Sequence, residues 1–478
     1  MKHILYLLLL IFSSQINAQV YPSQNINLVG HISPNTATTG LAQGDQRYSG
    51  CWGWYQSSKN KEYAISGGSS GTYFIDISSP ATPTVSDYVP GKTACIWREI
   101  KTYQNICYVA SDDFGINRFQ IIDMQYLPDS VHVIHDGNSY FNRSHTLWID
   151  NDKLYCGSVT YSNNSWASMA VYSLATPTAP VLLRKLQDDY SFIQHVHDMY
   201  VRNDTIFANC GNQGMYLFQL TATNTFTQLG SYINYASGSN YNHSSYLTPN
   251  GKHLVFCDEV PSGLPIRIVD VQNFSNITPV SSFIPYTTST PHNPYLTSNS
   301  IAVVSCYQDG LMVYNIANPA SPFVAGFFDT YPWGGAPSGN YLGGPYRGNW
   351  GAYPWLPSGL IIANDMQTGV FILDASAAYS TTVGVNLPTS TVGLDKYTLK
   401  DNFSVYPNPA SNKVNINYEN KSEALLQLTN ILGAVVFEKT YKNSIQESLW
   451  ISELENGTYF IKITEADKVT VKKLSVNH

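Results

Sequence analysis

Short apolar strands bounded by turn residues recur along the first three quarters of the chain. One strand type follows the pattern Gly-x-x-Φ-Φ-Asp-Ile, where Φ is a large apolar residue, as at residues 71–77. Seven copies occur, and three of them lack or displace the glycine: 71–77, 118–124, 169–174, 214–220, 266–271, 310–316 and 369–374. Self-similarity of this kind predicts a repeat architecture rather than a single irregular domain.

Two other strands precede each copy of this pattern. The nearer one ends in small or polar residues, as at 107–111, and the farther one begins with His or Trp. A fourth strand follows a turn marked by proline, as at 80–83 and 319–322. Proline suits such turns and the first residue of an edge strand because it cannot donate to the ladder. Four strands in a period of roughly 45–55 residues are typical of propeller blades.

The seventh unit, residues 350–374, contains three strands and then stops. The segment 25–30 has the character of the missing fourth strand, as a comparison with 226–230 shows. Pairing it with the last unit would close the ring and remove an exposed edge. The sequence therefore predicts an all-β fold, a seven-bladed β-propeller closed by the N-terminal strand over residues 19–379.

Both ends of the chain carry separate segments. Residues 1–18 combine a basic start, a short apolar run and small residues, which predicts a signal peptide cleaved after Ala18. That run is too short to span a bilayer, and we expect no transmembrane segment. Residues 380–400 are rich in Ser, Thr, Ala, Gly and Val and predict a linker. Short alternating strands then predict a small Ig-like β-sandwich over 401–478.

Composition narrows the classes of partner. Charged residues make up 12% of the chain and aromatic residues 13%, which favours a well-packed core over disorder. The net charge of −7, without a dense Lys/Arg cluster, speaks against nucleic acid as a partner. Five of the seven cysteines end equivalent strands and are expected to be buried apolar residues. Cys51 and Cys95 alone are placed so that either a disulfide bridge or two free thiols is expected.

Candidate chemistry centres on four histidines. His145, His197, His243 and His292 begin the first strand of four consecutive units, and Trp52, Trp97 and Trp350 are predicted to hold the same place in the other three. First strands line the channel of a propeller, so the imidazoles should converge. Imidazoles bind Zn²⁺ and other transition metals, and Asp198 and Glu259 would add oxygen ligands. A divalent metal in the central channel is the cofactor this set predicts; the alternative is that each His hydrogen-bonds a neighbouring backbone group or carboxylate.

A second candidate set is aromatic. Several Trp and Tyr residues lie between residues 331 and 355, in the long insertion before the seventh unit. They would either stack on a ligand or pack this loop over the channel. The candidate ligand-binding residues are Trp97, Arg98, Trp350, Tyr353 and Trp355. We find no nucleophile elbow, Walker loop or His-Glu-x-x-His motif, so no catalytic residue is assigned.

Two resemblances to known families rest on motifs. The strand Φ-Φ-Φ-Φ-Asp-Ile/Val resembles the LVIVD repeat. The series at 97–101, 145, 197–198, 243, 258–259, 292–295, 328–332 and 350–354 resembles the exported "choice-of-anchor B" proteins over about residues 25–375. His145-Thr146 departs from the usual His-Asn of that series. The resemblance implies a propeller whose biochemical function is not established.

The C-terminal segment resembles the type A sorting domain of the type IX secretion system. The matching residues are Tyr406, Pro407, Asn408, Pro409, Gly457, Tyr459, Lys472 and Lys473. The resemblance implies that the type IX secretion machinery is a partner and that the protein is secreted, either attached to the outer cell surface or released.

Together these patterns predict a secreted or cell-surface binding module for a protein, a glycan or a small ligand. The alternative is a metal-dependent hydrolase or lyase whose His-rich site lies at the mouth of the propeller channel. Two observations separate these hypotheses. One is the metal content of the protein, and the other is whether the four imidazoles converge on one point, as shared coordination requires.

Overall fold

The computed structural model describes residues 21–37, 45–92, 94–233, 235, 240–344, 346–388, 403–418, 422–430, 434–442, 444–465 and 468–478. The predicted signal peptide and its cleavage point at Ala18 lie outside these residues. The chain divides into two compact units, Met1–Ser390 and Thr391–His478. Each unit is described by itself below.

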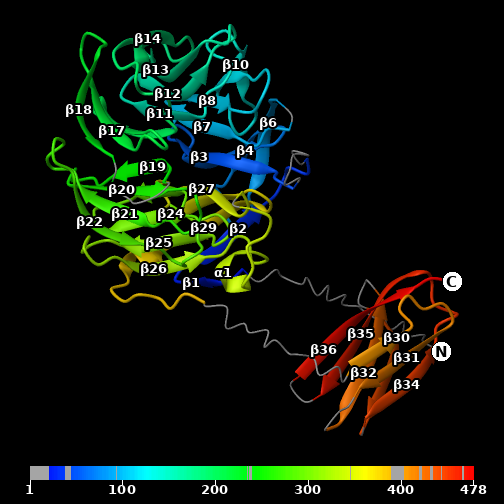
Figure 1. Ribbon diagram of the computed structural model, residues 1–478. Coiled ribbons are helices and arrows are strands. Elements are labelled where there is room, and N and C mark those ends of the chain that lie inside the picture. Colours follow the sequence, from blue (N-terminus) through cyan, green and yellow to red (C-terminus); the bar gives the residue numbers. More distant parts are fainter. Residues whose placement is uncertain are drawn as a thin grey trace, which may run out of the picture. The chain divides into compact units, whose positions relative to one another are not determined.

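The described part of the first unit is built from seven antiparallel sheets (Figure 1). Six of them have four strands and one has five. The first four sheets contain β3 (Tyr48–Gln56), β4 (Lys61–Gly68), β5 (Gly71–Asp76), β6 (Thr84–Pro90); β7 (Arg98–Tyr103), β8 (Ile106–Ser111), β9 (Phe119–Asp123), β10 (His132–Gly137); β11 (Thr146–Asp150), β12 (Lys153–Thr160), β13 (Trp166–Ser173), β14 (Val181–Lys185); and β15 (Asp198–Arg202), β16 (Thr205–Asn209), β17 (Met215–Leu220), β18 (Phe226–Tyr232).

The other three sheets follow the same plan with additions from the N-terminus. They contain β19 (Asn242–Leu247), β20 (His253–Asp258), β21 (Ile266–Asp270), β22 (Thr278–Phe283); β23 (Asn293–Leu296), β24 (Ile301–Ser305), β25 (Leu311–Asn315), β26 (Phe323–Phe328), β1 (Ser23–Gln24); and β27 (Asn349–Tyr353), β28 (Ile361–Asp365), β29 (Gly369–Asp374), β2 (Asn27–Ile32). The described helices are short: η1 (Leu186–Asp188), α1 (Gly335–Ser338) and α2 (Ser376–Ser380).

The first strand of each sheet contacts the first strands of its two neighbours. These contacts run in the order β3, β7, β11, β15, β19, β23, β27 and back to β3. A closed cycle of first strands places them around a central channel, which is the arrangement of a β-propeller. The first strands therefore position whatever side chains face the channel.

The N-terminal strand completes the last sheet. β2 pairs antiparallel with β29, and Asn27 lies opposite Asp374 and Ile32 opposite Val370. This is the pairing that the sequence predicts, and it covers the edge of β29. The two-residue strand β1, which was not predicted, adds to the edge of β26 through Ser23 and Gln24.

Apolar packing lies between adjacent sheets as well as within them. One buried cluster joins Tyr63, Ile65 and Phe74 of the first sheet to Val109 and Ile122 of the second. All six residues of β8 are buried, whereas the outer strand β10 is mostly exposed. This decrease in burial from the inner to the outer strands explains why the inner strands are nearly unbroken runs of apolar residues.

The aspartate of the repeated pattern ends the third strand of its sheet. The carboxylates of Asp76, Asp123, Asp270 and Asp374 each accept a hydrogen bond from the backbone N–H two residues further on, at 2.9 Å. Asn315 does the same at 3.0 Å in the sixth sheet. Such Asx turns redirect the chain as it leaves the third strand, which gives the pattern a structural reason.

Two expectations need correction. Cys51 and Cys95 are both free and buried, as are the other five cysteines, so the disulfide alternative is wrong for this structure. The predicted linker at 380–400 begins too early, because Val385 and Leu387 pack on the buried cluster of the fifth and sixth sheets. The backbone N–H of Val385 also donates to the carbonyl of Val324 at 2.9 Å.

The second unit contains two antiparallel sheets. One orders its strands as β30 (Phe403–Tyr406), β31 (Lys413–Tyr418), β34 (Ile445–Trp450), and the other as β33 (Val435–Tyr441), β32 (Ala424–Asn430), β35 (Gly457–Glu465), β36 (Lys468–Val476). Both sheets contribute to a single buried cluster that includes Val414, Leu426 and Ile461. This unit therefore has a core of its own.

Candidate functional site

Six rings form a continuous arc at the start of the channel-lining strands, which we call the histidine arc. Ring centroids are 4.1 Å apart for His145–His197, 4.3 Å for His197–His243, 4.3 Å for His243–His292, 4.5 Å for His292–Trp350 and 5.0 Å for Trp350–Trp97. Each histidine ring therefore contacts the next one along the arc, but among the described residues only His197 and His243 belong to a group whose ligand atoms lie within 4.8 Å of one another.

Hydrogen bonds at Nδ1 hold three of these imidazoles to the next sheet. The Nδ1 atoms of His197, His243 and His292 lie 3.3, 3.0 and 2.6 Å from the backbone carbonyl oxygens of His243, His292 and Trp350. A carbonyl only accepts, so each Nδ1 donates and each Nε2 carries the lone pair. His145 differs, because its Nδ1 lies 2.8 Å from the Asp112 carboxylate.

Glu259, the residue directly after β20 in the fifth sheet, lies against the arc. Its Oε2 is 3.7 Å from Nε2 of His243, and its Oε1 is 3.9 Å from Nε2 of His292. The Tyr307 hydroxyl donates to Oε1 at 2.7 Å. Within the part of the chain that the structure describes, His197, His243 and Glu259 form the one group whose ligand atoms all lie within 4.8 Å of one another.

Sequence reasoning missed Asp112 and Tyr307, yet a signal for them exists. Asp112, Glu259 and Tyr307 occupy the same place in three sheets, directly after the second strand or one residue beyond it. The register confirms this, because Ile106, His253 and Ile301 pair with Asp123, Asp270 and Asn315. Comparing the residues that follow the second strand of each repeat would have found all three.

Burial controls the protonation of the arc. It lowers the pKa of His243 to about 3, assisted by the charge of His145, and that of His292 to about 3, assisted by His243. Burial also holds the pKa of His197 well below its usual value. For His145 burial acts in the same direction, but the hydrogen bond and charge of Asp112 outweigh it and raise the pKa. Three neutral imidazoles therefore stand beside one that keeps a proton more readily.

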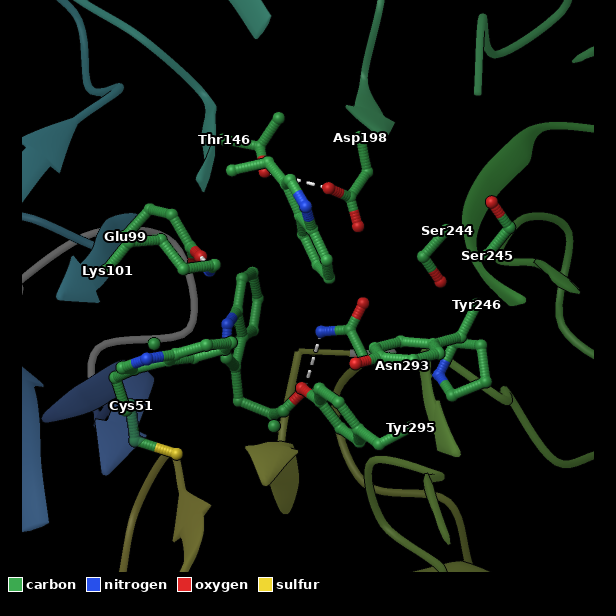
Figure 2. Close-up of a pocket in the computed structure, with 16 residues that line it drawn as sticks. Cys51, Glu99, Lys101, Thr146, Asp198, Ser244, Ser245, Tyr246, Asn293 and Tyr295 are labelled. Carbon is green, nitrogen blue, oxygen red and sulfur yellow. Dashed lines mark hydrogen bonds and ion pairs between the residues drawn. The ribbon is translucent and has the colours of Figure 1, made fainter. Parts of the chain in front are cut away.

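Asp198 does not join this cluster. Its carboxylate accepts hydrogen bonds from the Thr146 hydroxyl and the Met199 N–H, both at 2.8 Å. It faces a small cavity of about 60 Å³ further inside the channel, together with the ion pair of Glu99 and Lys101 (Figure 2). Burial raises the pKa of both Asp198 and Glu99, against the opposing charge of Lys101.

Trp52 belongs to a different layer from the histidines. It pairs with Ile65, just as Trp148 pairs with Tyr155 and Tyr353 with Ile362, which places all three at one register position. This position lies three residues past the histidines, roughly 10 Å along the strand. The expectation that Trp52 shares the histidine position is wrong, because β3 begins four residues earlier, at Tyr48.

The remaining aromatic candidates divide between the two levels. Trp97 and Trp350 stack in the histidine arc, whereas Tyr353 and Trp355 contact each other in the other layer, with ring centroids 5.3 Å apart. Arg98 faces neither, since its guanidinium donates to the carbonyls of Gly68 and Lys92 and to the Ser111 hydroxyl. The structure therefore does not gather these five residues into one surface.

A larger cavity of about 280 Å³ adjoins the arc. Tyr307 forms part of its wall, together with Cys306, Gln308, Thr290 and Tyr341. The Tyr307 ring also contacts His292, at a centroid distance of 4.4 Å. The cavity is close to the lower end of the size range of small-molecule sites.

In the second unit the predicted sorting residues lie around β36. The Asn408 side chain donates to the Lys473 carbonyl at 2.7 Å and accepts from the Ser475 N–H at 2.9 Å, which ties the segment of Tyr406, Pro407 and Pro409 to this strand. The Lys472 ammonium donates to the Phe403 carbonyl. The Tyr459 hydroxyl donates to the Glu455 carbonyl, and a Cβ at Gly457 would meet none of the described atoms within 4 Å.

Comparison with known proteins identifies this second unit. Residues 404–477 match the family model of a secretion system C-terminal sorting domain, Por_Secre_tail. The match indicates export through the type IX secretion system to the cell surface or the extracellular space. Among the described residues, no helix has the length and apolar character needed to span a bilayer. No curated protein matches the chain.

Several solved structures resemble the chain at low identity. They include the N-terminal domain of Nup159, with TM-score 0.47, 10% identity and coverage of 73% of this chain and 95% of that one. A protein from Lactobacillus plantarum has TM-score 0.45, 11% identity and coverage of 83% and 96%. A putative 6-phosphogluconolactonase from Bacteroides uniformis ATCC 8492 has TM-score 0.45, 11% identity and coverage of 85% and 99%. Any activity in these names belongs to those proteins.

Proposed function

We propose that this chain is an exported, seven-bladed β-propeller that works outside the cell as a binding module and takes its ligand at the histidine arc. Export is supported by the sorting-domain match over residues 404–477. Seven blades are supported by the seven sheets and by the closed cycle of contacts among their first strands. The Asx turns at the repeat aspartates support assignment to the LVIVD-repeat, choice-of-anchor B proteins.

The observation that carries the proposal is the continuous run of ring faces from Trp97 to His145. Aromatic and imidazole faces offer apolar contact together with hydrogen-bonding groups, a combination that recurs in ligand sites. Tyr346 extends the run, since its ring lies 5.0 Å from Trp97, and Tyr241 does so at 5.1 Å from His197. The adjoining cavity of about 280 Å³ provides room for part of a ligand.

Burial favours binding over hydrolysis at this place. His243, His292 and Glu259 are only 3%, 1% and 6% exposed. A metal-dependent hydrolase or lyase needs an open coordination position that its substrate can reach. Side chains this enclosed are better suited to holding a ligand or an ion than to turning over a large substrate. We therefore favour a binding function over a metal-dependent hydrolase or lyase.

The test is a binding screen on the mature chain with its sorting domain. Glycan arrays and a small-molecule thermal-shift library identify a ligand, and Trp350→Ala is then compared with Trp166→Ala, which changes a tryptophan that is 45% exposed on β13. We expect Trp350→Ala to weaken binding at least tenfold, because aromatic anchors dominate such sites, and Trp166→Ala to leave it unchanged. A ligand whose affinity is the same for both variants would place the site elsewhere.

A further inference from the structure

We propose that His197, His243 and Glu259 form a binding site for one divalent transition-metal ion, with Zn²⁺ as the representative case. The proposal deepens the proposed function by naming an ion as a ligand of the histidine arc. It stands on the geometry of these side chains and does not require that a glycan or small molecule also bind.

The separations between the ligand atoms are close to those of a bound ion. Around a tetrahedral ion with ligands at about 2.0–2.1 Å, neighbouring ligand atoms lie roughly 3.3 Å apart. His243 Nε2 and Glu259 Oε2 are already 3.7 Å apart, and all three ligand atoms lie within 4.8 Å of one another. Small side-chain rotations would close the remaining gap.

The hydrogen bonds orient the imidazoles as metal ligands. His197 and His243 each donate Nδ1–H to a backbone carbonyl, so the lone pair of each ring is on Nε2. Metal-binding histidines usually donate their other nitrogen to a carbonyl or carboxylate, which fixes the tautomer and the ring orientation. Here this outer contact comes from the next sheet and is repeated from one histidine to the next.

Glu259 is prepared in the same way. Its Oε1 accepts the Tyr307 hydroxyl at 2.7 Å, while its Oε2 faces His243. A carboxylate that is only 6% exposed needs compensation for lost hydration, and a bound cation would supply it. His292 borders the same carboxylate and is the nearest further imidazole for a fourth position.

The donor set selects the class of ion. Two imidazole nitrogens and one carboxylate oxygen suit Zn²⁺, Cu²⁺, Ni²⁺ or Fe²⁺, whereas Ca²⁺ and Mg²⁺ prefer all-oxygen sites. His145 lies outside the set because it is absent from the group whose ligand atoms lie within 4.8 Å of one another. The exposed His132 of the outer strand β10, which is not part of the histidine arc, provides the control.

The experiment uses the mature chain with its sorting domain, freed of metal by chelation and dialysed. Zn²⁺ binding is measured by calorimetry, and Co²⁺ is added separately because its visible absorption reports nitrogen and oxygen coordination. We expect one ion per chain, with affinity reduced at least tenfold in His243→Gln and Glu259→Gln. Tyr307→Phe should weaken binding about tenfold, as loss of an outer contact does. His132→Gln should stay within about threefold of the unchanged protein.

Thermal unfolding of each metal-free variant checks that it folds, and only folded variants are compared. Failure of the unchanged protein to take up either ion overturns the metal site, as does equal affinity in Glu259→Gln and His132→Gln. Neither result affects a glycan or small molecule that binds through Trp350. Conversely, metal uptake lost in Glu259→Gln supports the site even when the ligand screen finds nothing.

Discussion

At the scale of single residues, three buried carboxyl groups hold the connection between β26 and β27. Asp309 accepts hydrogen bonds from the Ala336 N–H and the Tyr341 hydroxyl. Asp329 accepts from the Tyr331 N–H, and Asp365 from the Thr330 hydroxyl. The second oxygen of Asp329 is buried and has no hydrogen-bond partner among the described residues, which makes this carboxyl the most costly of the three to ionise.

The protonation of Asp329 should make stability depend on pH. Burial raises its pKa to about 8, opposed by the Tyr331 N–H and reinforced by the charges of Asp309 and Asp365. The folded state therefore keeps a proton that the unfolded chain loses near its ordinary pKa of about 3.9. The contribution of this proton to the free energy of unfolding is complete below about pH 4 and is lost as pH rises toward 8. A difference of one in pKa between the folded and unfolded states corresponds to about 1.4 kcal/mol. Asp309 and Asp365, whose pKa values burial also raises, act in the same direction.

Asp329→Asn tests this coupling by thermal unfolding between about pH 5 and pH 8. The unchanged protein should lose melting temperature across this range, and the variant should lose less. Asp270→Asn is the control, because its backbone hydrogen bond from Gln272 lowers the pKa and its contribution stays constant in this window. The same pH slope in Asp329→Asn and the unchanged protein would show that Asp329 is ionised in the folded state.

The positions of the histidines could be predicted because a repeat aligns its own copies. His145, His197 and His243 stand at one place in the pattern, so their proximity follows once the first strands line a channel. Trp52 is not placed in this way, because β3 already starts at Tyr48 and the pairing of Trp52 with Ile65 puts it past the level of the histidines. The expectation that Asp198 joins the metal ligands fails for a related reason. Successive residues of a strand point to opposite sides, so Asp198 does not face Glu259 although it follows His197 in the sequence.

At the scale of elements, two glycines of outer strands allow neighbouring sheets to approach. Gly30 of β2 lies so close to the first sheet that a Cβ there would overlap the carbonyl oxygen of Pro80. Gly230 of β18 stands in the same relation to the carbonyl oxygen of Phe274 in the fifth sheet. Both glycines sit beside a register shift in their outer strand pairing. β2 therefore joins the last sheet to the first as β18 joins the fourth to the fifth.

Gly30→Ala and Gly230→Ala should consequently destabilise the first unit to a similar degree. Each added methyl group would push a carbonyl and its turn outward, at a cost of roughly 1–3 kcal/mol. Gly137→Ala in the outer strand β10 is the matched control, since a Cβ there meets only the His135 ring, at 3.5 Å. Denaturant unfolding measures the three changes. A neutral Gly30→Ala beside a damaging Gly230→Ala would contradict closure of the ring through β2.

At the scale of the whole molecule, the two units have separate cores. The buried cluster of the second unit consists only of residues between Phe403 and Val476. The sequence predicted this division from the change in strand pattern, but it placed the end of the propeller at 379. The segment after α2 is rich in small and polar residues, which is typical of a linker, and composition alone does not show which of its apolar residues pack against the propeller. Val385 and Leu387 do pack against it, and the Pro388 carbonyl accepts a hydrogen bond from the Tyr286 hydroxyl at 3.1 Å.

Two truncated chains, ending at Ser380 and at Ser390, therefore separate the roles of this segment and of the second unit. The longer chain keeps every described contact of the first unit, so its thermal transition should coincide with that unit's transition in the full chain. The shorter chain loses the partly buried Val385 and Leu387 side chains and three hydrogen bonds to the rest of the unit, which should lower the free energy of unfolding by about 2 kcal/mol. Calorimetry compares the three proteins, with the chain ending at Ser390 as the reference. Equal stability of the two truncated chains would mean that the segment after α2 contributes nothing to the propeller, and its apolar contacts would then need another explanation.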